Sequence, residues 1–187
     1  MEAISKTSKI EKIIKLTLIT IVGTILITIS AKVKIPFYPV PMTMQTFVIL
    51  LIGLTLGYRI GLATVALYLF EGIMGLPVFA SSPEKGIGIA YFVGPTMGYL
   101  IGFLVTVYFA GLFKYDKGPI NTFLKLIFSV SFIYILGLIW LGTLIGWDKP
   151  VFKLGAEPFL LAELFKILLL LFLIPTLSKV KKLIKII

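Results

Sequence analysis

The sequence contains no cysteine and no histidine among its 187 residues. These absences exclude disulfides, thiol nucleophiles, Cys/His zinc sites and histidine acid–base chemistry. No Gly-Lys-Ser or Gly-Lys-Thr phosphate loop occurs either, so the chain has no Walker A nucleotide site. Acidic residues are few, 8 against 18 basic ones. We therefore expect a protein that is not an enzyme and that holds neither a metal ion nor a cofactor.

Apolar residues, in contrast, make up 59% of the chain, and the mean hydropathy is +1.10. A soluble domain of this length needs more polar surface. Six apolar runs approach the length that crosses a bilayer, about 20 residues each. They predict an all-α membrane protein, a six-transmembrane-helix bundle that occupies 1–187 as one domain. The predicted helices cover residues 13–31, 43–57, 60–76, 90–113, 120–146 and 158–177.

The basic residues lie in the gaps between the apolar runs, which favours a membrane over a nucleic acid as the source of the +10 net charge. The larger basic set flanks the termini and two short connections: Lys6, Lys9, Lys12, Lys15, Arg59, Lys114, Lys117, Lys125, Lys179, Lys181, Lys182 and Lys185. The smaller set is Lys32, Lys34, Lys85, Lys149 and Lys153. The positive-inside rule therefore predicts an even number of crossings with both termini in the cytoplasm.

Three longer connections then face outward: the first long loop (32–42), the second (77–89) and the third (147–157). Such loops either close over a pocket or serve only as turns. Near them, Glu163 and Lys166 lie three residues apart and share one helix face. Ionisable residues at membrane depth are costly and are usually paired or functional. The two offer an acceptor for N–H groups and a donor for a carbonyl or an acid. They are a candidate solute site, with a structural ion pair as the alternative.

Further candidates surround the same outer end. Thr43 and Gln45 follow the proline-stiffened first long loop, and Gln45 offers an amide at the mouth of a pocket. Phe37 and Tyr38 pack either on an apolar ligand or at the membrane interface. Tyr99 is a candidate pocket wall. Glu71 is a third acid in an apolar run, and either lines this pocket or pairs with a lysine.

Small residues at helical spacing predict close helix packing in two places. In the fourth run these are Gly94, Gly98 and Gly102. In the first run they are Thr20, Gly23, Thr24, Thr28 and Ala31. The partner of the first run lies either inside this chain or in another protein, and the spacing fits both.

Several motifs in this order resemble the BioY family, the biotin-binding S components of energy-coupling factor (ECF) transporters. The resemblance covers about residues 30–175. The motifs are Pro39-Val40-Pro41-Met42-Thr43-Met44-Gln45-Thr46, Gly57-Tyr58-Arg59-Ile60-Gly61, Leu67-Tyr68, Gly75-Leu76-Pro77-Val78-Phe79-Ala80, Gly94-Pro95-Thr96-Met97-Gly98-Tyr99-Leu100-Ile101-Gly102-Phe103, and Pro158-Phe159 with Lys166.

The resemblance implies a six-helix bundle with cytoplasmic termini, biotin bound near the outer side, and a separate energising module of a transmembrane T component and two ABC ATPases. It also implies that Glu163 accepts ureido N–H bonds and that Lys166 faces the ureido oxygen or the carboxylate. Glu163 stands where the family usually has aspartate, and Met97 where glycine is common. Residues 81–86 also depart from the family pattern. Lipid is an expected partner; nucleic acid is not.

Three alternatives remain beside a biotin S component. One is an S component for another vitamin, such as riboflavin or thiamine. Another is a secondary transporter that works without an ATPase module. The third is a membrane scaffold that binds no solute. The first helix's small-residue face is the predicted contact with the T component.

Overall fold

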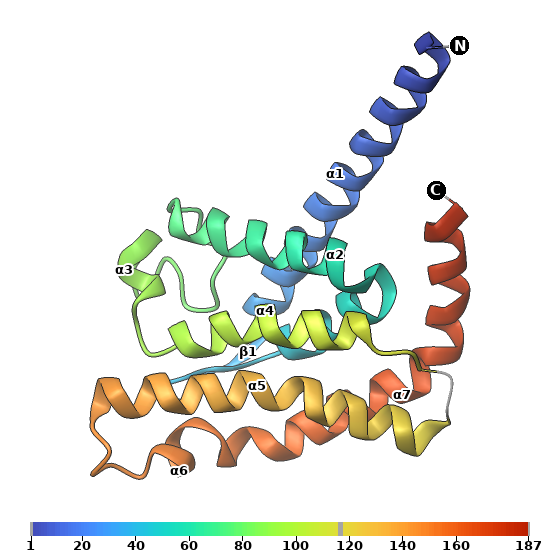
Figure 1. Cartoon of the computed structure of the whole chain (residues 1–187). Helices are drawn as coiled ribbons and strands as arrows, with labels where there is room; N and C mark the ends of the chain where they lie inside the picture. The colour runs from blue at the N-terminus through green and yellow to red at the C-terminus, as the bar shows by residue number, and fades with distance from the viewer. Residues whose placement is uncertain (1, 116–117, 187) are drawn as a thin grey trace.

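The computed structural model describes residues 2–115 and 118–186, and the side chains of residues 10–115 and 118–175. Most of the described chain is helical (Figure 1). The helices are α1 (Glu2–Lys32), α2 (Gln45–Ile73), α3 (Gly88–Phe92), α4 (Met97–Leu112), α5 (Pro119–Ile145), α6 (Val151–Gly155) and α7 (Glu157–Ile186). The strands β1 (Lys34–Ile35) and β2 (Met42–Thr43) complete the order.

Helix α2 doubles back on itself at Gly57. This glycine has φ 75° and ψ 173°, a left-handed conformation that side chains with a Cβ rarely adopt. The Gln45 side-chain amide therefore reaches the Tyr68 hydroxyl at 2.8 Å, whereas 23 residues of straight helix would rise about 34 Å. The reversal falls where the sequence predicts a break, so α2 consists of two antiparallel halves.

The single helix predicted over 90–113 is wrong in its first part. The structure has the short α3, then a non-helical turn, and α4 begins only at Met97. Pro95 explains the break, because proline lacks the N–H of a helix interior and disfavours helical geometry in the preceding residue, Gly94. The β1–β2 ribbon was not predicted. It pairs Lys34 with Thr43 and brings the two ends of the first long loop together.

In the part of the chain that the structure describes, four helical segments are long and apolar enough to cross a membrane: Ile10–Lys32, Gln45–Ile73, Pro119–Ile145 and Glu157–Pro175. Helix α4 is equally apolar but shorter. This count is lower than the six predicted runs for two reasons. The two halves of α2 correspond to two predicted runs but are counted together as one segment. The break at Pro95 makes α4 too short to be counted.

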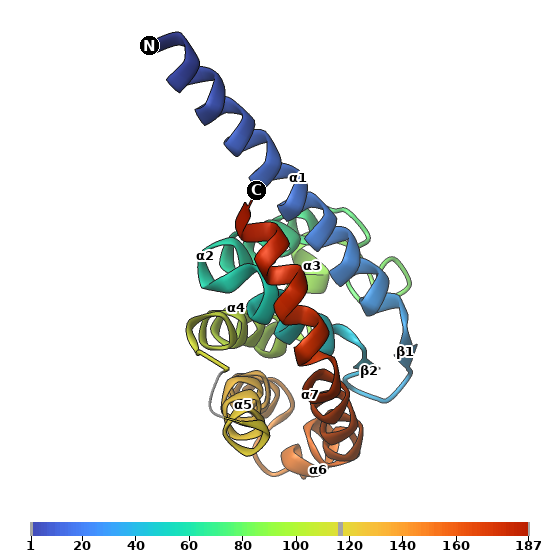
Figure 2. The same ribbon diagram turned by 90° about the vertical axis from the view of Figure 1, so that its right-hand side faces the viewer.

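The helices pack side by side in the order α1, α2, α4 and α5, with α7 against α2 and α5. Close approach of α4 to α5 depends on small residues. A side chain at Gly98 would meet the Leu136 carbonyl oxygen, and one at Gly102 would come within 2.6 Å of the Ile133 Cα. Both termini lie toward one end of the bundle, and the second and third long loops lie at the other (Figures 1 and 2).

Candidate ligand-binding site

A cavity with about 560 Å³ of space, its mouth included, lies at the loop end of the bundle. Its walls come from the first and second long loops and from β2, α2, α3, α4, α5 and α7. Most of the lining is apolar and aromatic. Several polar lining residues are linked to one another by hydrogen bonds and form the polar side of the cavity: Thr43, Gln45, Thr46, Tyr134, Glu163 and Lys166. The lining residues are Val40, Pro41, Met42, Thr43, Gln45, Thr46, Phe79, Ala80, Tyr91, Thr96, Tyr99, Leu100, Phe103, Ile133, Tyr134, Phe159, Glu163 and Lys166.

Glu163 and Lys166 form the centre of the polar side. Only 4% and 7% of their surfaces are exposed, and the Lys166 Nζ lies 3.4 Å from the Glu163 Oε2. Thr46 donates a hydrogen bond to the same Oε2 at 2.9 Å, and Tyr134 donates another at 2.9 Å. Lys166 also donates to the Thr43 carbonyl oxygen at 2.7 Å and to the Thr46 hydroxyl at 2.9 Å. The buried charges are thus paired and hydrogen-bonded, as burial requires.

The second carboxylate oxygen of Glu163 is different. Oε1 is buried and has no hydrogen-bond partner in the described part of the chain. Leaving a buried acceptor unsatisfied costs about 1–3 kcal/mol, and more when the group is charged. Because Glu163 lines the cavity, this oxygen is a candidate acceptor for an N–H donor of a ligand.

Gln45 is fixed by its neighbours at the edge of the cavity. Its Nε2 donates to the Tyr68 hydroxyl at 2.8 Å, and Tyr68 in turn donates to the Val78 carbonyl oxygen at 3.2 Å. The Thr43 hydroxyl donates to the Gln45 Oε1 at 3.2 Å. On α4, Tyr99 donates to the Gly155 carbonyl oxygen at 2.9 Å. The network holds these predicted residues in place around the cavity.

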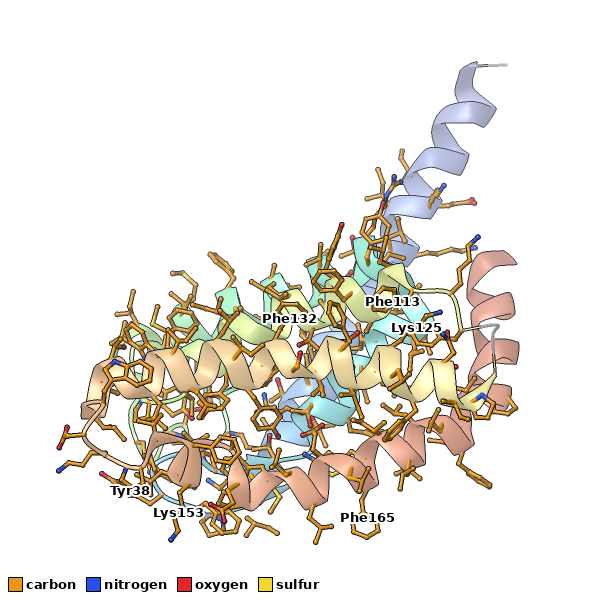
Figure 3. All side chains as sticks on the ribbon, turned by 60° about the horizontal axis from the view of Figure 1, so that its bottom comes forward. Tyr38, Phe113, Lys125, Phe132, Lys153 and Phe165 are labelled. Carbon is orange, nitrogen blue, oxygen red and sulfur yellow. The ribbon has the colours of Figure 1, made fainter. Side chains whose placement is uncertain are left out.

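Phe37 and Tyr38, the other two predicted ligand contacts, are not among the lining residues. Phe37 packs edge-on against Phe159, with ring centroids 5.8 Å apart, and so supports the wall from behind. Tyr38 is 85% exposed. Figure 3 shows it at the loop end of the molecule, away from Phe113 and Lys125, and the Lys85 Nζ lies 5.7 Å from its ring centroid. This arrangement of Phe37 and Tyr38 fits a position at the membrane interface better than contact with a ligand.

Comparison with protein families identifies the chain. A family model described as the BioY family matches residues 4–183. This chain belongs to the BioY family.

Relatives and a solved structure agree with this membership. The chain is 37% identical over 145 residues to "Biotin transporter BioY" of Thermotoga maritima, covering 77% of this chain and 84% of the relative. It is 35% identical over 141 residues to "Probable biotin transporter BioY" of Pyrococcus horikoshii, covering 75% and 82%. A crystal structure of the S-component for biotin from an ECF-type ABC transporter superposes with a TM-score of 0.72 at 26% identity, covering 94% and 93%. The chain is a multi-pass protein of the cell membrane.

In this BioY-family chain, sequence reasoning missed Thr46 and Tyr134. In the sequence, Thr46 stands out only as the last residue of a motif. Tyr134 lies within a long apolar run, where nothing in the spacing sets it apart. A signal was nevertheless present, because a tyrosine hydroxyl at membrane depth needs a hydrogen-bond partner. Glu163 is that partner.

The small residues of α1 mostly face inward. Gly23, Thr24 and Ala31 are buried against the rest of the chain, whereas Thr20 and Thr28 are partly exposed. A side chain at Gly23 would come within 2.5 Å of the Thr64 methyl group, so this glycine allows α1 to approach α2. For the three buried residues the packing partner therefore lies within this chain.

Glu71 does not line the cavity. Its Oε1 accepts a hydrogen bond from the Thr24 hydroxyl at 3.1 Å, and no lysine pairs with it among the described side chains. Both roles considered for this acid are therefore wrong. Glu71 instead links α2 to α1.

Proposed function

We propose that this chain is a biotin-capturing S component, which binds the vitamin at the outer surface and is energised by a separate module. The single observation that carries the proposal is the unpartnered Glu163 Oε1 in the wall of the cavity. Family membership supports it, because similar chains are named as biotin transporters. The cavity has the chemistry that this ligand requires.

Biotin has a ureido ring with two N–H donors and a carbonyl, an apolar bicycle with a tail, and a carboxylate. The ureido N–H groups match the free acceptor of Glu163. The bicycle matches the aromatic wall, where Phe79, Tyr91 and Phe159 line the cavity. A site built to hydrogen-bond a ligand discriminates strongly against analogues that lack the matching group.

Lys166 contributes by fixing the carboxylate. An ammonium has three N–H donors, and here they face the Thr43 carbonyl oxygen, the Thr46 hydroxyl and Glu163. A ligand oxygen reaches this ammonium only by replacing one of these partners. Lys166 therefore acts first as a positioning residue for Glu163 and Thr46.

The membrane topology we propose has six crossings and two cytoplasmic termini. The reversal at Gly57 supports treating the two halves of α2 as separate crossings, and α4 supplies another in spite of its length. Both termini lie toward the same end of the bundle in Figures 1 and 2. That end carries most of the positive charge of the sequence, as a cytoplasmic surface should.

The partner we propose is an ECF module, with a transmembrane T component and two ABC ATPases. The missing Walker A sequence supports an external energy source. For the T component, the structure offers an apolar groove between α1 and α2. Its lining residues are Ile13, Leu16, Thr17, Thr20, Ala63 and Leu67. Thr20, one of the small residues of α1, lines this groove beside neighbours on α2, which supports the role proposed for it at the T-component contact.

A ligand screen on purified protein tests the proposed function. Biotin, riboflavin and thiamine are each titrated against the same sample, and only biotin should bind. Binding of riboflavin or thiamine instead would assign the chain to another vitamin. Uptake in vesicles that lack the ATPase module, driven by an ion gradient, would indicate a secondary transporter. Failure of all three ligands to bind would favour a scaffold.

A further inference from the structure

Two lysines of the first long loop bind the second long loop. The Lys32 Nζ donates to the Phe79 carbonyl oxygen and to the Ser82 carbonyl oxygen, each at 2.7 Å. The Lys34 Nζ donates to the Ala80 carbonyl oxygen at 3.0 Å and pairs with the Glu84 carboxylate at 2.7 Å. These four contacts tie the end of α1 and the start of β1 to residues 79–84.

The segment they capture forms part of the cavity. Phe79 and Ala80 both line it. The Phe79 ring has no exposed surface and lies among Tyr68 and Tyr91, with ring centroids 5.6 and 5.1 Å away. If residues 79–82 moved outward, the ring would leave its neighbours and the cavity would lose one wall. The first long loop supplies the adjacent wall through Val40 and Pro41.

We propose that Lys32 and Lys34 form a latch that holds the second long loop closed and slows release of the bound ligand. The proposal rests on the proposed function, since it assigns a role in ligand residence to a biotin site. The two lysines act on the ligand only through the loop and are therefore positioning residues. Three of the four targets are backbone carbonyls, so only the contact between Lys34 and Glu84 depends on a side chain of the divergent segment 81–86.

The two lysines contribute unequally. Lys32 reaches two carbonyls, and hydrogen bonds from charged donors are stronger than those between neutral groups. Lys34 forms one carbonyl contact and an ion pair with Glu84, whose side chain is 68% exposed. This pairing holds the pKa of Glu84 below its ordinary value. Exposed pairs nevertheless contribute little to stability. Lys32 is therefore the principal element of the latch.

The first test measures how fast labelled biotin dissociates from the purified full chain. Lys32→Met should raise the dissociation rate about fivefold, as expected for the loss of partly exposed charged hydrogen bonds. Lys32→Arg keeps the donors and should stay within about twofold. Lys153→Met is the matched control, because it removes an exposed lysine of the third long loop and should change nothing. An unchanged rate for a folded Lys32→Met protein would overturn the latch. So would equal acceleration by Lys32→Met and Lys32→Arg.

The second test needs no ligand and separates failure of the latch from failure of the proposed function. The chain has no cysteine, so Ile87→Cys and Thr143→Cys admit two spin labels at defined positions. Lys32→Met should add a second, longer distance between the labels, and Lys153→Met should not. If wild-type protein binds no biotin, the proposed function fails while this distance still tests the latch. Identical distances in all variants would overturn it.

Discussion

The Lys166 ammonium lies 3.4 Å from the Glu163 Oε2, and both side chains are almost completely buried. Removing either partner leaves an uncompensated charge in the interior, which is costlier than the loss of one contact. The pair is also asymmetric. Oε2 has three donors around it, whereas Oε1 has none in the described chain. This asymmetry favours a ligand site over a purely structural ion pair, and the experiments below test the two.

Replacement of the acid tests the free acceptor. Glu163→Gln removes the negative charge and leaves Lys166 without its counter-charge, so biotin affinity should fall about 100-fold. Calorimetric titration of the purified variant measures this. Glu157→Gln, which neutralises an exposed acid of the same helix, serves as the control and should bind like wild type. Undiminished affinity of Glu163→Gln would contradict a role for the negative charge of Glu163 in ligand binding.

Replacement of the lysine tests the positioning role. Lys166→Ala removes the donors to the Thr43 carbonyl oxygen and to Thr46, and leaves Glu163 as a lone buried carboxylate. The free energy of unfolding should fall by about 3–5 kcal/mol, and biotin binding should weaken at least tenfold. Thermal unfolding and ligand titration report the two effects separately. With Lys153→Ala as the control, wild-type affinity in Lys166→Ala would remove this residue from the site.

The Tyr134 hydroxyl should matter although the sequence did not single it out. Tyr134→Phe deletes one hydrogen bond to the Glu163 carboxylate and should weaken biotin binding about fivefold to tenfold. Tyr108→Phe is a suitable comparison, because that ring packs against Tyr58 and Phe109 away from the cavity. Equal affinity in the two variants would show that Glu163 does not depend on Tyr134 for its position.

These residues show what the sequence could and could not predict. Glu163 and Lys166 stood out because charges are rare in apolar runs and the two are only three residues apart. Thr46 and Tyr134 meet Glu163 across 117 and 29 residues of chain. Such pairings depend on how helices pack, and spacing along one helix carries no information about it. The Gly57 reversal was predictable from the charged break that follows it, whereas the β1–β2 ribbon arises only from contacts across the first long loop.

The close approach of α4 to α5 should be sensitive to volume. Gly98→Leu would force a side chain against the Leu136 backbone and Trp140. Overpacking typically costs about 1–3 kcal/mol, and the displaced α4 should also disturb the cavity wall at Tyr99. Thermal unfolding should show a lower midpoint. Ile139→Leu, at a half-exposed position on α5, should leave the midpoint unchanged. An unchanged midpoint for Gly98→Leu would contradict close packing of α4 against α5 at this position.

The groove between α1 and α2 should matter for transport but not for binding. Thr20→Trp fills part of it and should reduce biotin uptake in cells that contain the ECF module, while the purified variant binds biotin normally. Val22→Trp places the same bulk at an exposed position of α1 outside the groove and should leave uptake intact. Full uptake by Thr20→Trp would refute this face as the T-component contact.

The central claim is that this chain binds biotin in the cavity at Glu163. The most direct measurement is mass spectrometry of the small molecules that copurify with the full chain, with labelled biotin binding to the same preparation as its control. We predict one biotin per chain, and a marked decrease of both signals in Glu163→Gln. A different copurifying vitamin, or a wild-type preparation that neither carries nor binds biotin, would contradict the account.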